Sequence, residues 1–160
     1  MKTQQVQRTE TKSDPPLEPP LAFLQRLWRL NQALELLSAR MERSLGITAQ
    51  QRLVLRCIGR SPKVTPGQLA ELLHLDPGTI SAAIKRLGAK GLIERTKDET
   101  DSRRALLTLS KVGRRLDIAN SDGTVEGCVR TLLAETSPAK LRTLAVTIDR
   151  LTELLDATAP

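Results

Sequence analysis

Residues 65–87 read TPGQLAELLHLDPGTISAAIKRL, and this stretch decides the fold. It contains two helix starts of the same kind, because Thr65 and Asp76 are each followed directly by a proline. A short polar side chain caps the first turn of a helix, and proline suits the first helical position because the N–H it lacks would have no partner there. The stretch therefore predicts a short helix, a tight turn at His74, and a second helix over residues 76–90.

The second predicted helix has one apolar face and one polar face. Its apolar residues recur three and four positions apart, which is the spacing of one side of a helix: Ile80, Ala83, Ile84 and Leu87. The second helix of a helix-turn-helix enters the DNA major groove, where hydroxyl and basic side chains bind phosphates and base edges, and its first N–H groups favour phosphate. We therefore expect DNA contacts from Thr79, Ser81, Lys85 and Arg86.

A charged hairpin is predicted directly after this helix. Residues 92–96 and 104–109 have the composition of two short strands, and the segment between them is entirely polar. Asp101 and Arg103 are two positions apart at the tip, so the carboxylate can orient the guanidinium. A narrow minor groove attracts an arginine through its negative potential, so Arg103 is expected to enter the minor groove. The basic side chains expected to meet the DNA backbone are Arg95, Lys97 and Arg104.

The rest of the chain is predicted to form a tail and flanking helices. Residues 1–20 end in four prolines within six positions, so we expect a disordered tail. Residues 21–46 and 111–156 carry apolar residues at helical spacing, with a bend or break near Gly123. Since no globular remainder is left for them to cover, both segments are predicted to be dimerisation helices. Residues 47–110 would form the winged helix-turn-helix lobe between them.

The composition favours packed helices. The chain of 160 residues has one Phe, one Trp and no Tyr, whereas β-sandwich strands favour aromatic and β-branched residues. The predicted fold class is therefore all-α, mainly helical with a small β-hairpin wing. Thr48 and Gln51 have the spacing of a capping box for the helix that precedes residue 65. The side chains expected inside the lobe, besides those of the second helix, include Leu53, Val54, Cys57, Ile58, Leu69, Leu72 and Leu73.

The charge of the chain indicates a polyanionic partner. The formal net charge is +7, and residues 48–109 carry eleven Lys and Arg against six Asp and Glu. Such an excess suits nucleic acid or an anionic membrane surface. The basic residues gather around the predicted turn and hairpin and do not follow one amphipathic face. We therefore expect nucleic acid as the partner and no membrane.

Other classes of function find little support in the sequence. Cys57 and Cys128 form neither a disulfide framework nor a zinc pattern, and with one histidine we expect no metal and no cofactor. Both cysteines are interpreted as structural thiols. The sequence has no nucleophile elbow and no phosphate-binding glycine loop, so we do not expect an enzyme. No apolar run spans a bilayer and the N-terminus lacks a signal peptide, so the cytoplasm is the expected location.

Five stretches of the sequence follow one another in a characteristic order: LDPGTIS (75–81), IKRL (84–87), KGLIER (90–95), DSRR (101–104) and LTLSKVG (107–113). In this order of motifs the sequence resembles the MarR family of winged-helix transcription regulators, over about residues 21–156. The resemblance implies a homodimer joined by its first and last helices, a palindromic double-stranded operator near the protein's own gene, and usually repression. It also implies release of DNA when a small-molecule effector enters between the dimer helices and the lobe.

Two alternatives keep the same fold. A winged helix can serve as a module for protein–protein interaction, or as an architectural DNA binder without sequence preference. Selectivity for an operator over random DNA separates these alternatives from a specific regulator.

Overall fold

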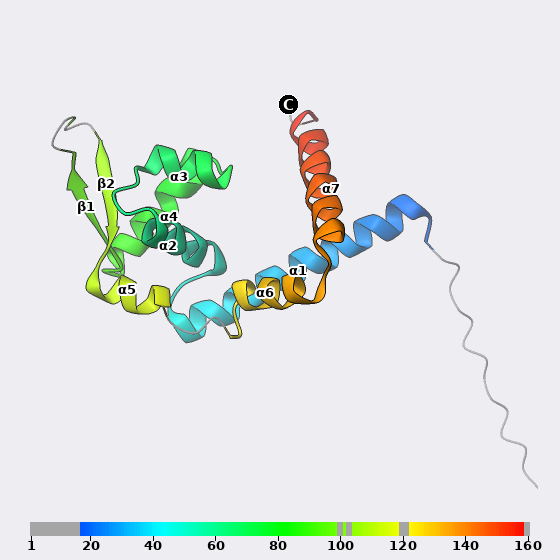
Figure 1. The fold of residues 1–160 in the computed structure, drawn as a ribbon, viewed down its shortest axis with the longest axis horizontal. Coiled ribbons are helices and arrows are strands. Elements are labelled where there is room, and N and C mark those ends of the chain that lie inside the picture. The colour runs from blue at the N-terminus through cyan, green and yellow to red at the C-terminus, as the bar shows by residue number, and fades with distance from the viewer. Residues whose placement is uncertain (1–16, 99–100, 102–103, 119–121, 159–160) are drawn as a thin grey trace, which may run out of the picture. The chain divides into compact units, whose positions relative to one another are not determined.

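The structure, a computed structural model, describes residues 17–98, 101, 104–118 and 122–158. The described part is mainly helical with one antiparallel hairpin, which confirms the predicted fold class. Its elements are α1 (Pro19–Leu45), α2 (Ala49–Arg60), α3 (Pro66–Leu73), α4 (Pro77–Ala89), β1 (Ile93–Lys97), β2 (Ala105–Leu109), α5 (Lys111–Ile118), α6 (Val125–Glu135) and α7 (Pro138–Asp156) (Figure 1).

Helix α1 starts earlier than the sequence suggested. Its first residue is Pro19, so the last two residues of the predicted tail are helical. Prolines break a helix interior, but Pro19 and Pro20 occupy the first positions, where a missing N–H costs nothing. Residues 1–16 lie outside the described residues, and their disorder stays a prediction. The chain forms two units, residues 1–33 and 34–160, so the boundary between them falls within α1.

The hydrophobic core of the second unit lies where α2, α3 and α4 meet the hairpin. The apolar face predicted for α4 is buried, and all four of its residues are at most 4% exposed. From the other elements the core receives Ile47, Val54, Leu55, Ile58, Val64, Leu69, Leu92, Ile93, Leu107 and Leu109.

Two leucines predicted to be buried are exposed. Leu53 of α2 is 45% exposed and Leu72 of α3 is 57% exposed. Only one face of α2 reaches the core. Leu55 lies on this face, whereas Leu53, two positions earlier, lies on the opposite side of the helix. Helix α3 has only eight residues and buries Leu69 alone. Helices α2 and α3 therefore carry more apolar side chains than the core can cover.

The capping box predicted at Thr48 is present, and α3 begins with a second capping box at Thr65. Thr48 Oγ1 accepts a hydrogen bond from the Gln51 N–H at 3.2 Å, and the Gln51 side chain accepts from the Thr48 N–H at 3.4 Å. Thr65 and Gln68 make the same exchange at 3.2 and 2.9 Å. Each box satisfies two donors that a helix N-terminus would otherwise leave unpaired.

The part of the predicted helical segment between Ser110 and Glu135 contains two separate helices. Helix α5 ends at Ile118 and α6 begins at Val125, with Gly123 at a φ of +70° between them. A positive φ is cheap for glycine, and Thr124 then caps α6 by accepting the Gly127 N–H at 3.2 Å. The predicted break near Gly123 is therefore confirmed. Within the described ranges, no helix combines the length and apolar character that crossing a bilayer requires.

Candidate nucleic-acid interface

The turn between α3 and α4 is fixed by its backbone. His74 adopts a left-handed conformation with a φ of +48°. Its N–H donates to the Glu71 carbonyl at 3.3 Å, and the Leu75 N–H donates to the Ala70 carbonyl at 3.1 Å. This pair of bonds is a Schellman motif, which ends α3 and reverses the chain direction. His74 is thus a turn residue, as the sequence predicted.

Asp76 fixes the start of α4. Its Oδ2 accepts the Thr79 N–H at 2.8 Å. Hydrogen bonds from the backbone N–H groups of Thr79 and Gly78 hold the pKa of the Asp76 carboxyl below its ordinary value, so the cap is charged at neutral pH. The Asp76 carboxylate therefore already binds the first N–H groups of α4, which the sequence predicted as a binding site for a DNA phosphate. An anion approaching α4 would meet its side chains instead.

The outward face of α4 carries the predicted DNA contacts. Ser81, Lys85 and Arg86 are exposed, and Thr79 is half-buried. Ser81 and Lys85 are four positions apart, so they follow one another along the same side of the helix. Helix α4 contains no acidic residue. The outward face of α4 is therefore positively charged, and its side chains near the N-terminal end of the helix are short.

The hairpin places further basic side chains in solvent. Strands β1 and β2 pair in antiparallel register from Ile93 opposite Leu109 to Lys97 opposite Ala105. Each strand starts one residue later than predicted. The predicted backbone contacts Arg95, Lys97 and Arg104 are all exposed.

The tip of the hairpin is described only in part. Asp101 is exposed, and its carbonyl accepts the Arg104 N–H at 2.9 Å. Arg103 lies outside the described residues, so its orientation by Asp101 stays a prediction.

A short segment before α3 joins the hairpin, which the sequence analysis missed. Val64 pairs with Leu107 of β2: the Leu107 N–H donates to the Val64 carbonyl at 2.9 Å. The Lys63 N–H donates to the Leu107 carbonyl, also at 2.9 Å, and Lys63 has a φ of +67°. The available signal was a β-branched residue directly before the Thr65 cap. The α2–α3 loop is thereby attached to the wing.

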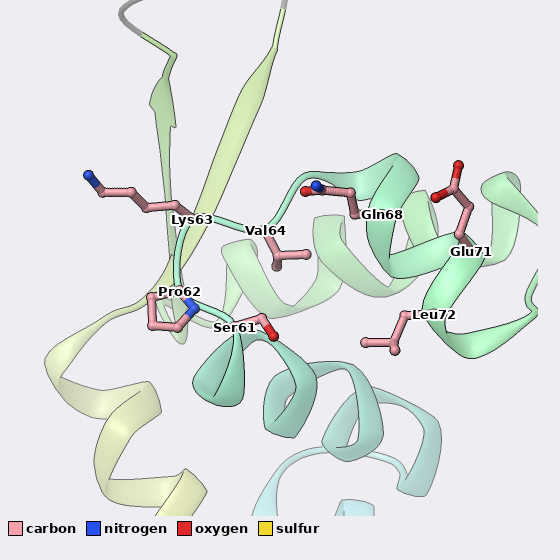
Figure 2. Close-up of a pocket in the computed structure, with 7 residues that line it drawn as sticks. All are labelled: Ser61, Pro62, Lys63, Val64, Gln68, Glu71 and Leu72. Atoms are coloured by element: carbon pink, nitrogen blue, oxygen red, sulfur yellow. The ribbon is translucent and has the colours of Figure 1, made fainter.

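A pocket lies where this loop passes α3 (Figure 2). Figure 2 shows Lys63 extending away from Glu71, while Leu72 lies on the side of α3 that faces α2. The lining residues are Ser61, Pro62, Lys63, Val64, Gln68, Glu71 and Leu72.

An ion cluster that the sequence did not predict joins α2 to α5 and α6. Arg52, only 1% exposed, places Nε 2.6 Å from Glu126 Oε2. Arg56 Nε lies 3.0 Å from Glu126 Oε1, and Arg56 Nη1 lies 3.0 Å from Asp117 Oδ1. Burial tends to lower the pKa of Arg56, but its bonds to Asp117 and Glu126 raise it overall. The signal was two arginines four positions apart on a helix with buried neighbours.

The cysteines differ in their surroundings. Cys57 is half-buried against the core, and burial raises the pKa of its thiol, which keeps it protonated and weakly reactive. Cys128 is exposed on α6, so burial gives no support to a structural role for it. Across the part of the chain that the structure describes, no three His, Cys, Asp or Glu side chains gather as metal ligands.

These elements define a winged helix-turn-helix protein: two capped helices around a left-handed turn, followed by a hairpin with an attached third segment. Comparison with known proteins then gives the family, since the sequence model of the MarR family matches residues 45–104. The chain belongs to the MarR family.

Three similar proteins illustrate the match. The organic hydroperoxide resistance transcriptional regulator of Bacillus subtilis (strain 168) is 35% identical over 85 residues, which cover 52% of this chain and 58% of that protein. A solved structure of a probable transcriptional regulator from Pseudomonas aeruginosa is 31% identical with a TM-score of 0.60, covering 78% of this chain and 94% of that one. A mutant of MarR from E. coli, solved in complex with operator DNA, is 26% identical with a TM-score of 0.64, covering 83% of this chain and 94% of that one.

The similarity in sequence is concentrated in the winged-helix lobe. The chain spans 52–60% of the length of relatives such as the Bacillus regulator, the SarZ regulator of Staphylococcus epidermidis and the MarR protein of Salmonella typhimurium. The relatives it matches are transcriptional regulators.

Proposed function

We propose that this chain is a transcriptional regulator, acting as a repressor, that binds a palindromic operator in double-stranded DNA as a homodimer. The observation that carries the proposal is the division of α4 into two faces. One face anchors the helix in the core, and the other presents hydroxyl and basic groups without any acidic residue. A recognition helix needs both properties, because it must be held rigidly while its outer side chains reach the bases.

The proposed DNA contacts fall into two groups: those that read the base sequence and those that only position the protein on the DNA. Thr79, Ser81, Lys85 and Arg86 read the major groove, where an arginine can bind a guanine edge through two hydrogen bonds. Arg103, oriented by Asp101, enters the minor groove. The phosphate contacts, which position the protein without reading sequence, come from Arg95, Lys97 and Arg104.

Apolar side chains on the flanking helices support the homodimer. Helix α7 buries no residue in this chain, and Val146 and Leu155 are more than 60% exposed. In α1, Trp28 is 73% exposed. Exposed apolar surfaces of this kind mark sites where another molecule binds, and a second copy of this chain would cover them. Two copies can place two recognition helices about one helical turn of DNA apart, which supplies the affinity that a single module lacks.

A groove within the second unit supports a small-molecule effector. It is lined by apolar side chains from the end of α1 and the start of α5, with Lys90 and Arg115 also present. The Lys90 ammonium donates to the Gly46 carbonyl, which connects the ends of α4 and α1. An anion with an apolar body would suit this lining. It would compete with the Gly46 carbonyl for the Lys90 ammonium, and the loss of this contact between α4 and α1 would release the repressor from DNA. We propose no catalytic role, and we propose the cytoplasm as the location of the protein.

Fluorescence anisotropy with two labelled duplexes tests the proposal. One duplex carries the intergenic DNA upstream of the protein's own gene, and the other has the same composition in scrambled order. We expect a preference of at least ~10³-fold for the first, together with a steep dependence on salt. Equal affinity for both duplexes would indicate an architectural DNA binder. Absence of binding to either would favour a protein–protein module.

Substitutions on α4 sharpen the test. Replacement of Arg86 by Ala should lower the preference for the operator by about 5- to 100-fold, because a base contact carries the discrimination. The matched control is Arg142→Ala, which removes the same side chain from the exposed surface of α7. The control should leave the preference unchanged.

A further inference from the structure

We propose that Lys63 and Gln68 belong, with Lys97 and Arg104, to a groove that binds the phosphodiester backbone of DNA. The inference rests on the proposed function, which it extends from the helix and the wing to the α2–α3 loop. Among the described residues, the groove is lined by Lys63, Gln68, Thr96, Lys97, Asp98, Arg104 and Leu106.

The charges of the groove favour an anion. Lys63, Lys97 and Arg104 contribute three cations, against the single carboxylate of Asp98. They come from two separate stretches of sequence, since Lys63 precedes α3 whereas Lys97 and Arg104 flank the hairpin tip. Cations that gather from distant positions into one groove produce a concentrated positive potential, which a linear polyanion can follow.

The backbone holds Lys63 at the edge of this groove. Its N–H donates to the Leu107 carbonyl, and the next residue, Val64, pairs with the same strand residue. The position has a φ of +67°, a conformation that glycine adopts with less strain than lysine does. Figure 2 shows the side chain extended and directed away from the acidic Glu71. Lys63 is exposed, so its ammonium is free to meet a ligand in solvent.

Gln68 adds hydrogen-bond donors at the start of α3. Its side-chain carbonyl accepts the Thr65 N–H at 2.9 Å, which fixes the orientation of the amide. The amide NH₂ group is then left to donate, and Gln68 is exposed. The first helix of a helix-turn-helix crosses the DNA backbone when the second lies in the major groove. A donor at the N-terminal end of α3, beside three cations, is therefore placed for phosphate oxygens.

Phosphate is the ligand class that this lining fits. Lysine and the amide of glutamine bind phosphate oxygens without demanding a particular base. The loss of Lys63 should therefore weaken binding to all duplexes alike and should leave operator preference unchanged. This expectation separates the groove from the recognition face of α4, where a substitution changes the preference.

The test uses the full chain with Lys63→Gly and Lys63→Gln. Glycine relieves the left-handed backbone, so Lys63→Gly should fold at least as stably as the natural protein, and weaker binding cannot then be caused by misfolding. Glutamine keeps the backbone strain and removes only the charge. The matched control is Arg142→Gln, which removes one positive charge from the side of α7 opposite Leu144. Anisotropy with the operator and scrambled duplexes is measured from low to moderate salt, and thermal unfolding is followed in parallel.

We expect both Lys63 variants to bind either duplex about 3- to 10-fold more weakly at low salt. The salt slope should fall by about 0.9 for each chain bound, as one phosphate contact predicts. If the natural protein binds DNA and the Lys63 variants match Arg142→Gln in affinity and slope, the groove assignment is wrong while the proposed function stands. A loss confined to the operator would also overturn it, since Lys63 would then read sequence. If the natural protein binds neither duplex, both the groove and the function are overturned.

Discussion

Arg52 of α2 and Glu126 of α6 form an ion pair at 2.6 Å between Nε and Oε2, although they are 74 positions apart in the chain. The Arg52 side chain is 2% exposed and that of Glu126 is 31% exposed. Arg52 also donates to the Leu116 carbonyl at 3.3 Å, near the end of α5. Arg52 therefore connects the winged-helix lobe to α5 and α6.

Replacement of Glu126 by Gln should destabilise the protein by about 2 kcal/mol, because it removes the charge that compensates a buried guanidinium. Urea unfolding at neutral pH measures the effect. The control is Glu153→Gln, which breaks the ion pair with Arg150 on the exposed surface of α7, where both side chains are about two-thirds exposed. Exposed pairs contribute little, so the control should change stability by less than about 0.5 kcal/mol. Equal effects of the two substitutions would contradict the structural weight given to the buried pair.

The same pair predicts how stability depends on pH. Burial would raise the pKa of Glu126, but the hydrogen bonds and charges of Arg52 and Arg56 lower it below its ordinary value of 4.5. A carboxyl with a lowered pKa in the folded state stabilises the protein above its unfolded pKa, and the contribution is lost as the pH falls through the folded pKa. The difference in unfolding free energy between the natural protein and Glu126→Gln should therefore be constant near neutral pH and shrink below about pH 4.5. A difference that stays constant into acid would show that the charge of Glu126 contributes nothing.

The parts of the fold that the sequence predicted are those with local causes. The α3–α4 unit follows from the Thr65 and Asp76 caps, each of which is completed within four residues of its own position. The apolar spacing of α4 likewise fixes which face is buried. Such signals are readable because cap, turn and helix all lie within one short window of sequence.

The missed features depend on distant partners. The spacing of Arg52 and Arg56 does not indicate Glu126 as their partner, and Val64, beside Lys63, does not indicate which strand this segment joins. The apolar pattern predicts Leu53 and Leu72 in the core, yet both are exposed, because the rotation of each helix is set by what packs against it. Tertiary packing, which pattern alone does not determine, decided these positions.

Gly113 marks a close approach that a side chain cannot enter. A Cβ at this position would lie 1.9 Å from the Leu92 carbonyl oxygen, while the Gly113 N–H bonds to Ser110 Oγ at 3.0 Å. Gly113→Ala should therefore destabilise the protein by about 3 kcal/mol or more, because backbone must move to admit the methyl group. Thermal unfolding compares it with Gly88→Ala, where the added Cβ meets nothing within 4 Å. The control should gain about 0.5 kcal/mol from helix propensity. A tolerated Gly113→Ala would mean that α5 does not start against the hairpin as described.

The exposed apolar face of α7 gives the last prediction. Leu144, Ile148 and Leu155 follow one another at helical spacing, and each is between 47% and 62% exposed. If a second copy covers this face, Ile148→Lys places a charge in the dimer interface, whereas Thr147→Lys places the same charge beside it. Sedimentation equilibrium should find a dimer for the natural protein and for Thr147→Lys, and a shift toward monomer for Ile148→Lys. The monomer should lose affinity for the palindrome and keep its weaker affinity for a half-site, because the recognition helix is intact and only the pairing is lost. Dimers of equal strength in both variants would place the dimer interface elsewhere, and a monomeric natural protein would remove the basis for reading a palindrome.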